Sequence, residues 1–280
     1  MLITTGEIVE AARASGSGVA AFNVITLEHA EAIAAAAEST GLPAILQISQ
    51  NAVRFHGSLR PIAAACAAVA RVSSAPLSLH LDHVDDTELL HLARACEASS
   101  VMFDASALDD AANIAATGAA ARWAHANGLW IEAELGAIGG KGGAHAPGVR
   151  TDPAEAAAFT AATGVDALAV AVGSTHAMRE RTAVLDLELV GRLRAAVPVP
   201  LVLHGSSGVT GPQLAAVVRH GMVKINIGTL INIAFTGAIR PLLADAAVVD
   251  PRAYLRPARA AITAAVADCQ RAVSGLRPAA

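Results

Sequence analysis

Residues 77–106 read LSLHLDHVDDTELLHLARACEASSVMFDAS, and this stretch contains a complete strand–helix–strand unit. The short apolar runs Leu77–His83 and Ser100–Ser106 are typical of buried strands. Between them, Thr87–Ser99 has the amphipathic period of a helix, and Asp86 is suited to cap its first turn. Strands that alternate with helices in this way indicate an α/β fold.

The same unit recurs along the whole chain. Further strands are predicted at Gly18–Val24, Pro43–Ser49, Trp130–Gly136, Ala167–Gly173, Pro200–Ser206 and Met222–Gly228. Further helices are predicted at Leu27–Thr40, Ala107–Asn127, Asp152–Thr163 and Asp186–Ala196, with capping residues Thr26, Thr151 and Thr210 and closing glycines Gly41, Gly128, Gly164 and Gly221. Eight such units in 280 residues predict an α/β protein with a single (β/α)8 TIM barrel, one domain over residues 1–280. A doubly wound open sheet is the alternative, but no GxGxxG follows the first strand.

The composition excludes several other classes of protein. The chain is 54% hydrophobic and 16% charged, with a net charge of −4, which does not fit a disordered chain. No apolar run reaches the roughly 18–20 residues of a membrane span, and Glu7 and Glu10 interrupt the start where a signal peptide would lie. Since the chain has no block of Lys or Arg, nucleic acid is not expected as a partner. We therefore expect a cytoplasmic protein without a membrane partner.

Polar residues follow several of the predicted strands, at the end where a TIM barrel carries its active site. Three of them are histidines from different strands, namely His83, His176 and His204. Three neutral imidazoles with an open fourth position suit a catalytic zinc ion. A single histidine of this kind is more simply an ordinary polar loop residue, whereas three on one rim favour the metal. His80 lies two residues before Asp82, so we expect it to point into the barrel in a core role.

Two glycine-containing turns follow the seventh and eighth predicted strands. They are residues 204–208, HGSSG, and residues 226–229, NIGT. TIM barrels often bind phosphate at this position, because backbone N–H groups and small hydroxyls there can surround an anion. Taken alone, HGSSG is more simply a tight turn, and the two turns together favour a phosphate site.

Motifs spread over nearly the whole chain, in the same order, resemble those of class II ketose-bisphosphate aldolases, the zinc-dependent fructose- and tagatose-bisphosphate aldolases. The chain length is closer to the shorter, tagatose-type branch. The motifs are AFNV (21–24), LHLDH (79–83), EAELG (132–136), LAVAVGSTH (168–176), PLVLHGSSG (200–208), VKINIGT (223–229) and DPRAYLRP (250–257).

The resemblance implies an aldolase that reversibly cleaves a phosphorylated ketose into dihydroxyacetone phosphate and an aldehyde. It assigns the zinc ligands to His83, His176 and His204, and proton transfer at the C4 hydroxyl to Asp82. It places Asp104 and Glu134 near an alternative or second metal position. The residues implied to bind substrate are Asn23, Ser49, Gly205, Ser207, Asn226, Gly228 and Thr229.

The resemblance also implies an assembly and a second cofactor. Arg256 is expected to reach the distal phosphate from a neighbouring subunit, so a homodimer or homotetramer is expected. The expected partner is a small-molecule sugar phosphate. Besides Zn²⁺, a monovalent cation, Na⁺ or K⁺, is a candidate cofactor.

The chain departs from the family pattern in the loop after the fifth strand. The family usually carries there a glutamate that takes the C3 proton of the ketone, but residues 136–151 contain no acid. Lys141 and His145 are the titratable candidates in its place, His145 as a base and Lys141 as a substrate contact, and a loop without a catalytic role is the third alternative. Smaller departures are Ala177, Gly228 and Leu230. Two alternatives follow: a family member with an altered substrate, or a non-catalytic sugar-phosphate-binding subunit.

Overall fold

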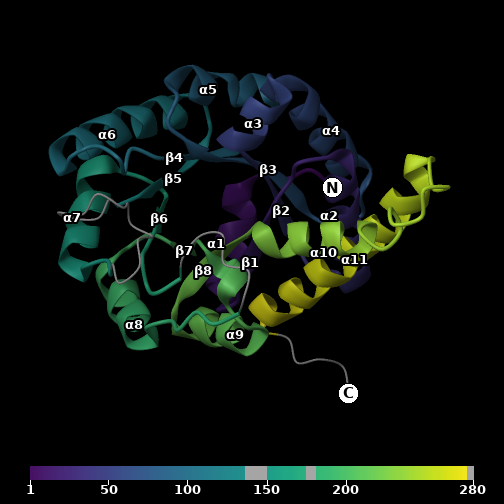
Figure 1. Cartoon of the computed structure of the whole chain (residues 1–280). Coiled ribbons are helices and arrows are strands. Elements are labelled where there is room, and N and C mark those ends of the chain that lie inside the picture. The colour runs from purple at the N-terminus through teal and green to yellow at the C-terminus, as the bar shows by residue number, and fades with distance from the viewer. Residues whose placement is uncertain (136–149, 175–180, 276–280) are drawn as a thin grey trace.

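The strands of the protein close into a parallel barrel in the order in which they occur in the chain, as the computed structural model shows (Figure 1). The structure describes residues 1–135, 150–174 and 181–275. The barrel closes where β1 (Val19–Asn23) pairs with β8 (Met222–Ile227). The strands between them are β2 (Ala44–Ser49), β3 (Leu77–Val84), β4 (Ser100–Phe103), β5 (Trp130–Glu134), β6 (Ala167–Ala169) and β7 (Leu201–Leu203). The predicted TIM barrel is confirmed, since an open sheet would leave β1 and β8 apart.

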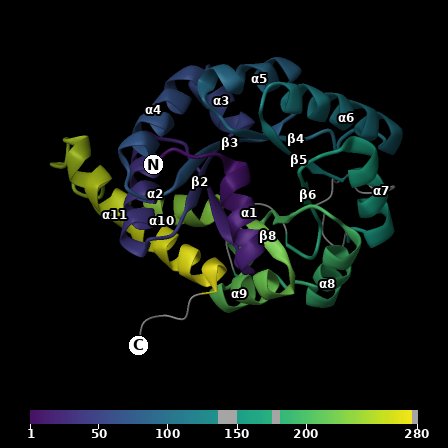
Figure 2. The ribbon, with the colours of Figure 1, turned by 180° about the vertical axis from the view of Figure 1, so that it is seen from behind.

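Helices cover the outside of the barrel, and most follow a strand directly (Figures 1 and 2). Each predicted strand is present, with bounds that differ by a few residues. Single turns of 3-10 helix lie at Arg94–Cys96 and Ser206–Gly208. The helices are α1 (Thr5–Ser15), α2 (Leu27–Thr40), α3 (Gln50–His56), α4 (Leu59–Val72), α5 (Thr87–Leu92), α6 (Asp110–Ala126), α7 (Pro153–Thr163), α8 (Leu187–Ala196), α9 (Gly211–His220), α10 (Thr229–Ile239) and α11 (Pro251–Ser274).

Two local predictions are wrong. The helix predicted to run to Ser99 ends at Leu92 and a 3-10 turn follows at Arg94–Cys96, which Glu97 ends by adopting a left-handed backbone with φ of 62°. The cap predicted at Thr151 belongs to Asp152, whose carboxylate accepts from two backbone N–H groups of the first turn of α7. Thr151 instead accepts a hydrogen bond from the backbone N–H of Ala171, which ties this segment to the end of β6.

The N-terminal end of the barrel is closed. Helix α1 lies across this end (Figure 2) and packs Ile8 and Val9 against Val19, Ile45 and Val223. The amino group of Met1 donates to the carbonyls of Ala70, near the end of α4, and Ala75, which fixes the start of the chain there. A cavity of about 290 Å³ between α1 and α11 is lined largely by apolar groups. The candidate site therefore lies at the opposite end of the barrel, at the C-terminal ends of the strands.

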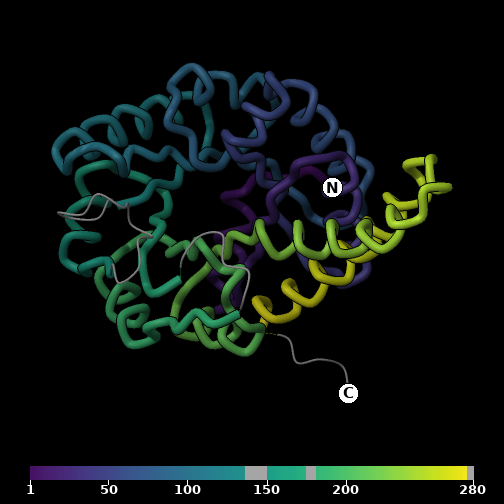
Figure 3. Tube along the Cα trace, in the orientation of Figure 1, coloured from purple at the N-terminus to yellow at the C-terminus, as the bar shows by residue number. Residues whose placement is uncertain are grey.

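Helices α10 and α11 extend beyond the outline of the barrel as a helical arm, residues 239–254 (Figures 1 and 3). Leu243 and Val249, at its tip, are 52% and 84% exposed. Among the described residues, no helix is long and apolar enough to cross a membrane.

Candidate metal and phosphate site

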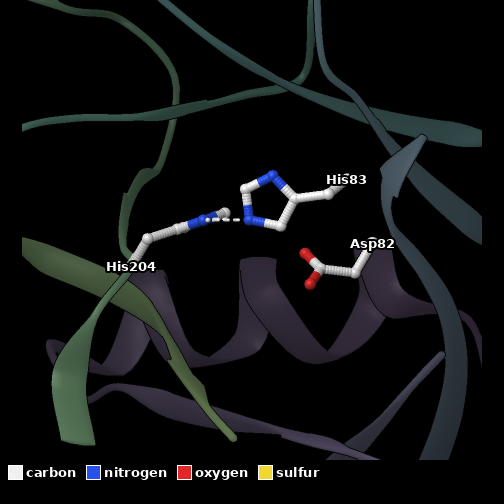
Figure 4. Close-up of side chains that lie close together, drawn as sticks. All are labelled: Asp82, His83 and His204. Atoms are coloured by element: carbon white, nitrogen blue, oxygen red, sulfur yellow. Dashed lines mark hydrogen bonds between the residues drawn. The ribbon is translucent and has the colours of Figure 1, made fainter. Parts of the chain in front are cut away.

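A distortion at the end of β3 places two adjacent side chains in the same site. In a regular strand, neighbouring residues point to opposite faces, so Asp82 and His83 would be separated. His83 instead has a positive φ of 50°, and the pairing of β3 with β4 shifts between Leu81 and Val84. Figure 4 shows the result: the Asp82 carboxylate and the His83 ring face the same space. A strained residue at a strand end is a frequent feature of functional sites.

His83 faces His204, which follows β7, across the mouth of the barrel. The ring nitrogens His83 Nε2 and His204 Nδ1 are 3.1 Å apart, and the rings meet edge to face at 85° (Figure 4). A zinc ion sits about 2.0–2.1 Å from imidazole nitrogens, so one ion fits between two nitrogens at this separation. Asp82 belongs to the same group of potential ligands.

The buried carboxylate of Glu132 determines which ring nitrogen of His204 carries the proton. Its Nε2 lies 2.9 Å from the Glu132 carboxylate, and both side chains are fully buried. Lys224, also fully buried, pairs with the other oxygen of Glu132 at 2.8 Å. A carboxylate paired in this way accepts the Nε2 proton, so the lone pair of His204 is on Nδ1, facing His83. Carboxylates commonly orient metal-bound histidines in this manner.

His83 is oriented by Asp104, at the end of β4. His83 Nδ1 lies 2.7 Å from Asp104, and the same carboxylate accepts from the backbone and hydroxyl of Ser106. Burial opposes the charged form of both groups, but the negative charge of Asp82 and the bond to Asp104 raise the pKa of His83 to about 10. The contacts with His83 and Ser106 hold the pKa of Asp104 well below its usual range. In the metal-free protein a proton on His83 therefore occupies the place suited to a cation.

Asp82 combines burial with a fixed hydrogen bond. Burial raises its pKa, against the opposing charges of His83 and Lys224. Asn226 donates its amide N–H to Asp82 at 3.3 Å, and the amide oxygen of Asn226 accepts from Lys224 at 2.7 Å. A carboxyl group with a raised pKa can both hold and release a proton, which suits an acid or base.

The ends of β7 and β8 surround a space for an anion. Helix α10 begins at Thr229, which lines the cavity together with Ser206 and Ser207, and among its first backbone N–H groups that of Leu230 donates to the Ser207 hydroxyl. Helix N-termini bind phosphate through such groups. A Cβ atom at Gly228 would lie 2.9 Å from Asn23 Oδ1, so a larger residue here would require Asn23 to shift. The glycine at this departure from the family pattern therefore makes room for Asn23.

The cavity that joins these features has a volume of about 250 Å³. It brings together most of the predicted residues: Asn23, Ser49, Asp82, His83, His204, Gly205, Ser207, Asn226, Gly228 and Thr229. Glu134 and Asp104 form a second group of potential metal ligands with His83, and Glu134 lies 3.9 Å from His204 Nδ1. His80 is fully buried inside the barrel and bonds Ser100.

The remaining predicted residues differ in what the structure says of them. His176, Lys141 and His145 lie outside the described residues, and Asp104 and Glu134 stand beside His83 without lining this cavity. Arg256 is exposed on α11 and does not line the cavity of its own chain, so its role across a subunit interface stays a prediction.

Sequence reasoning missed the residues behind the rim. Glu132 and Lys224 each lie two residues before a recognised site residue, Glu134 and Asn226, so the strand period turns them toward the same interior. This two-residue spacing could have identified both residues, since the same spacing from Asp82 placed His80 inside the barrel. Asn232, which also lines the cavity, lies on a helix and gave no such signal.

A closed barrel with paired imidazoles, buried carboxylates and anion-binding turns at the ends of its strands is typical of metal-assisted enzymes that act on phosphorylated substrates. The chain matches the model of the family "Fructose-bisphosphate aldolase class-II" over residues 3–275. It therefore belongs to the class II fructose-bisphosphate aldolases, a family of generally metal-dependent lyases.

Individual relatives agree with this assignment. The chain is 36% identical over 270 residues to a fructose-bisphosphate aldolase of Geobacillus stearothermophilus, covering 95% of this chain and 94% of the relative. The crystal structure of the YdjI aldolase from Escherichia coli K12 superposes with a TM-score of 0.88 at 29% identity, over 98% of both chains. A putative fructose-1,6-biphosphate aldolase from Coccidioides immitis gives 0.84 at 28% identity, over 97% and 96% of the chains.

Proposed function

We propose that this aldolase uses a zinc ion to cleave a phosphorylated ketose reversibly into dihydroxyacetone phosphate and an aldehyde. The observation that carries the proposal is the facing pair of nitrogens, His83 Nε2 and His204 Nδ1, 3.1 Å apart. Each lone pair is directed there by a carboxylate behind its ring, Asp104 for His83 and Glu132 for His204. Two acceptors directed at one point favour a cation between them.

The residues fit a zinc ion, with His83 and His204 as ligands and His176 as the third ligand implied by the resemblance. A zinc ion bound there supplies a Lewis acid for the ketone carbonyl. Asp104 and Glu132 act through the two imidazoles, because they fix which ring nitrogen of each carries the proton. Glu134 lies on the same side of the site and is available to a metal in a second position.

Asp82 is the proposed acid and base at the C4 hydroxyl of the ketose. Cleavage requires removal of that proton, and the reverse reaction requires its return to the aldehyde oxygen. The raised pKa of Asp82 brings the group closer to the pH at which it works. Asn226 keeps the carboxylate in place by donating to one of its oxygens.

The proximal phosphate is proposed to lie between the Gly205–Gly208 turn and Asn226–Thr229. The N-terminus of α10, which begins at Thr229, is proposed to face it, since helix N-termini favour anions. Ser207 already accepts from the backbone N–H of Leu230, which fixes the two turns relative to each other. A monovalent cation beside this phosphate stays a prediction from the resemblance.

A second copy of the chain is proposed to complete the site. The helical arm exposes Leu243 and Val249, and Arg256 lies at its base on α11. A homodimer or homotetramer that covers the arm would bring Arg256 toward a partner's cavity. Arg256 would then contact a second phosphate of the substrate through charge-assisted hydrogen bonds.

The loop that lacks an acid is the reason to keep an altered substrate as the second candidate. Residues 136–151 contain no Asp or Glu, so the base that takes the C3 proton differs from the usual glutamate. His145 is the proposed replacement base and Lys141 the proposed contact to an anionic group. Proton exchange at C3 of dihydroxyacetone phosphate in His145→Ala and Lys141→Ala variants separates these roles.

The proposal is tested by metal analysis together with aldol cleavage of fructose 1,6-bisphosphate and tagatose 1,6-bisphosphate. We expect about one zinc ion per chain and cleavage of at least one of the two ketoses. Cleavage of neither, with zinc bound and dihydroxyacetone phosphate proton exchange intact, would favour an altered aldehyde half. A purified protein that binds no divalent metal tightly would refute the proposal.

A further inference from the structure

Asparagine side chains at the cavity have their amide oxygens held by groups that can only donate. Lys224 donates to the amide oxygen of Asn226 at 2.7 Å. Lys224 also lies 3.4 Å from Gln47 Oε1, which leaves Gln47 Nε2 to donate to Asn23 Oδ1 at 3.2 Å. Because a lysine has no acceptor, these orientations follow from chemistry, and the amide nitrogen of Asn226 is left to donate to Asp82.

The side-chain amide of Asn232 is oriented by a hydrogen bond from His29. The backbone N–H of Thr26 donates to His29 Nδ1 at 3.4 Å, and the Thr26 hydroxyl lies 3.1 Å from the same nitrogen. Burial lowers the pKa of His29, so its ring is neutral and its single proton is on Nε2. Nε2 then donates to Asn232 Oδ1 at 3.3 Å. The amide oxygen of Asn232 is therefore occupied by His29, and its NH2 group is the part available to a ligand in the cavity.

The support behind Asn232 is rigid. His29 is 2% exposed, and its ring lies 5.0 Å from that of Phe235, one turn further along α10. Within the described part of the chain, the amide nitrogen of Asn232 has no protein acceptor. Asn232 lines the cavity together with Gly228 and Thr229, which lie one turn earlier on the same face of α10.

The position of Asn232 decides which part of a substrate it meets. The metal ligands come from β3 and β7, and the proposed phosphate turns follow β7 and β8. The remaining wall includes Ile25, Ser49 and Asn51, which lie at or just beyond the ends of β1 and β2, and Asn232. With the ketone at the metal and the proximal phosphate at the turns, this wall is left for the aldehyde half.

We infer that Asn232, oriented by His29, is a substrate-positioning residue that donates a hydrogen bond to a hydroxyl oxygen of the aldehyde half of the ketose. The inference rests on the proposed function, because it takes the metal and the phosphate turns as the places of the other half. The chemical class it selects is a polyhydroxylated chain, since a neutral amide donor matches a hydroxyl oxygen without requiring a charge.

The test separates the two halves of the substrate. Cleavage is measured with fructose 1,6-bisphosphate or tagatose 1,6-bisphosphate, whichever the parent cleaves faster. Proton exchange at C3 is measured with dihydroxyacetone phosphate, which lacks the aldehyde half. The variants are Asn232→Ala, Asn232→Asp, which keeps the shape but replaces the donor by an acceptor, and His29→Leu. Thr236→Ala, an exposed change one turn away on α10, is the matched control.

Loss of one hydrogen bond to substrate lowers kcat/KM by about tenfold, and an unpaired acceptor at the same place lowers it further. We expect Asn232→Ala to lower kcat/KM for cleavage about tenfold more than it lowers exchange. Asn232→Asp should exceed that loss, His29→Leu should show a smaller loss of the same kind, and Thr236→Ala should match the parent.

The inference would be overturned if Asn232→Ala and Asn232→Asp lowered cleavage and exchange equally, or lowered neither. The proposed function would still stand in that case, provided that the parent protein is active. A parent that neither cleaves nor exchanges would refute the proposed function, and this inference with it. If His29→Leu fails to fold, the two Asn232 variants decide the question alone.

Discussion

Lys224→Met offers the sharpest test of the buried charge pair beneath the site. Lys224 Nζ lies 2.8 Å from Glu132, and both side chains are 0% exposed. Methionine fills a similar volume without the charge, so among the described residues the variant leaves the buried Glu132 carboxylate with His204 as its partner. Removing one member of a buried pair costs about 3–5 kcal/mol, because the remaining charge is uncompensated.

The assay is urea unfolding of metal-free protein, so that metal binding does not contribute to the free energy of unfolding. The matched control is Arg259→Met, which breaks the exposed pair of Arg259 with Glu31, whose side chains are 47% and 36% exposed. Solvent screens that pair, and its loss should cost at most about 1 kcal/mol.

A second variant identifies the cause of the loss. Lys224→Met combined with Glu132→Gln removes the uncompensated charge, and we expect it to recover at least half of the stability lost in the single variant. A loss below about 1 kcal/mol in Lys224→Met, or a double variant no more stable than the single one, would refute the reasoning.

Three further outcomes follow from the structure. Gly228→Ala should weaken binding of dihydroxyacetone phosphate about tenfold by titration calorimetry, because its Cβ would crowd Asn23; unchanged affinity would show that Asn23 moves aside. The lowered pKa of His29 means the unfolded chain binds its proton more readily, so urea stability should fall as pH drops below about 6.5; His29→Leu should lose that part of the slope, and an identical slope would contradict it. Arg256→Ala should weaken a bisphosphate more than a monophosphate in kcat/KM, and equal losses would remove Arg256 from this role.

The barrel itself was accessible from the sequence, because apolar runs and amphipathic helices repeat regularly. The errors arose where one residue overrides the pattern. Glu97 ends the 3-10 turn after α5 through a left-handed backbone that is rare for glutamate, and Asp152 rather than Thr151 caps α7. Such local competition is decided by tertiary contacts, as the bond from Ala171 to Thr151 shows.

The site was accessible in part. Polar residues at strand ends and the family motifs brought Asp82, His83, His204 and Asn226 into view, and the cavity contains all four. The bulge at His83 was not predictable, because strand alternation places neighbouring residues on opposite faces. The supports from Glu132 and His29 depend on which strands and helices become neighbours, and that information appears only in the folded chain.

Metal dependence of proton exchange is the most direct test of the central claim. The measurement is exchange of the C3 proton of dihydroxyacetone phosphate with deuterated solvent, followed by NMR, in metal-depleted protein and during titration with zinc. We predict no exchange without metal, and full exchange at about one zinc ion per chain. His204→Ala should stay inactive at the same zinc concentration. Exchange at the full rate in the depleted protein, or none with zinc bound, would contradict the account.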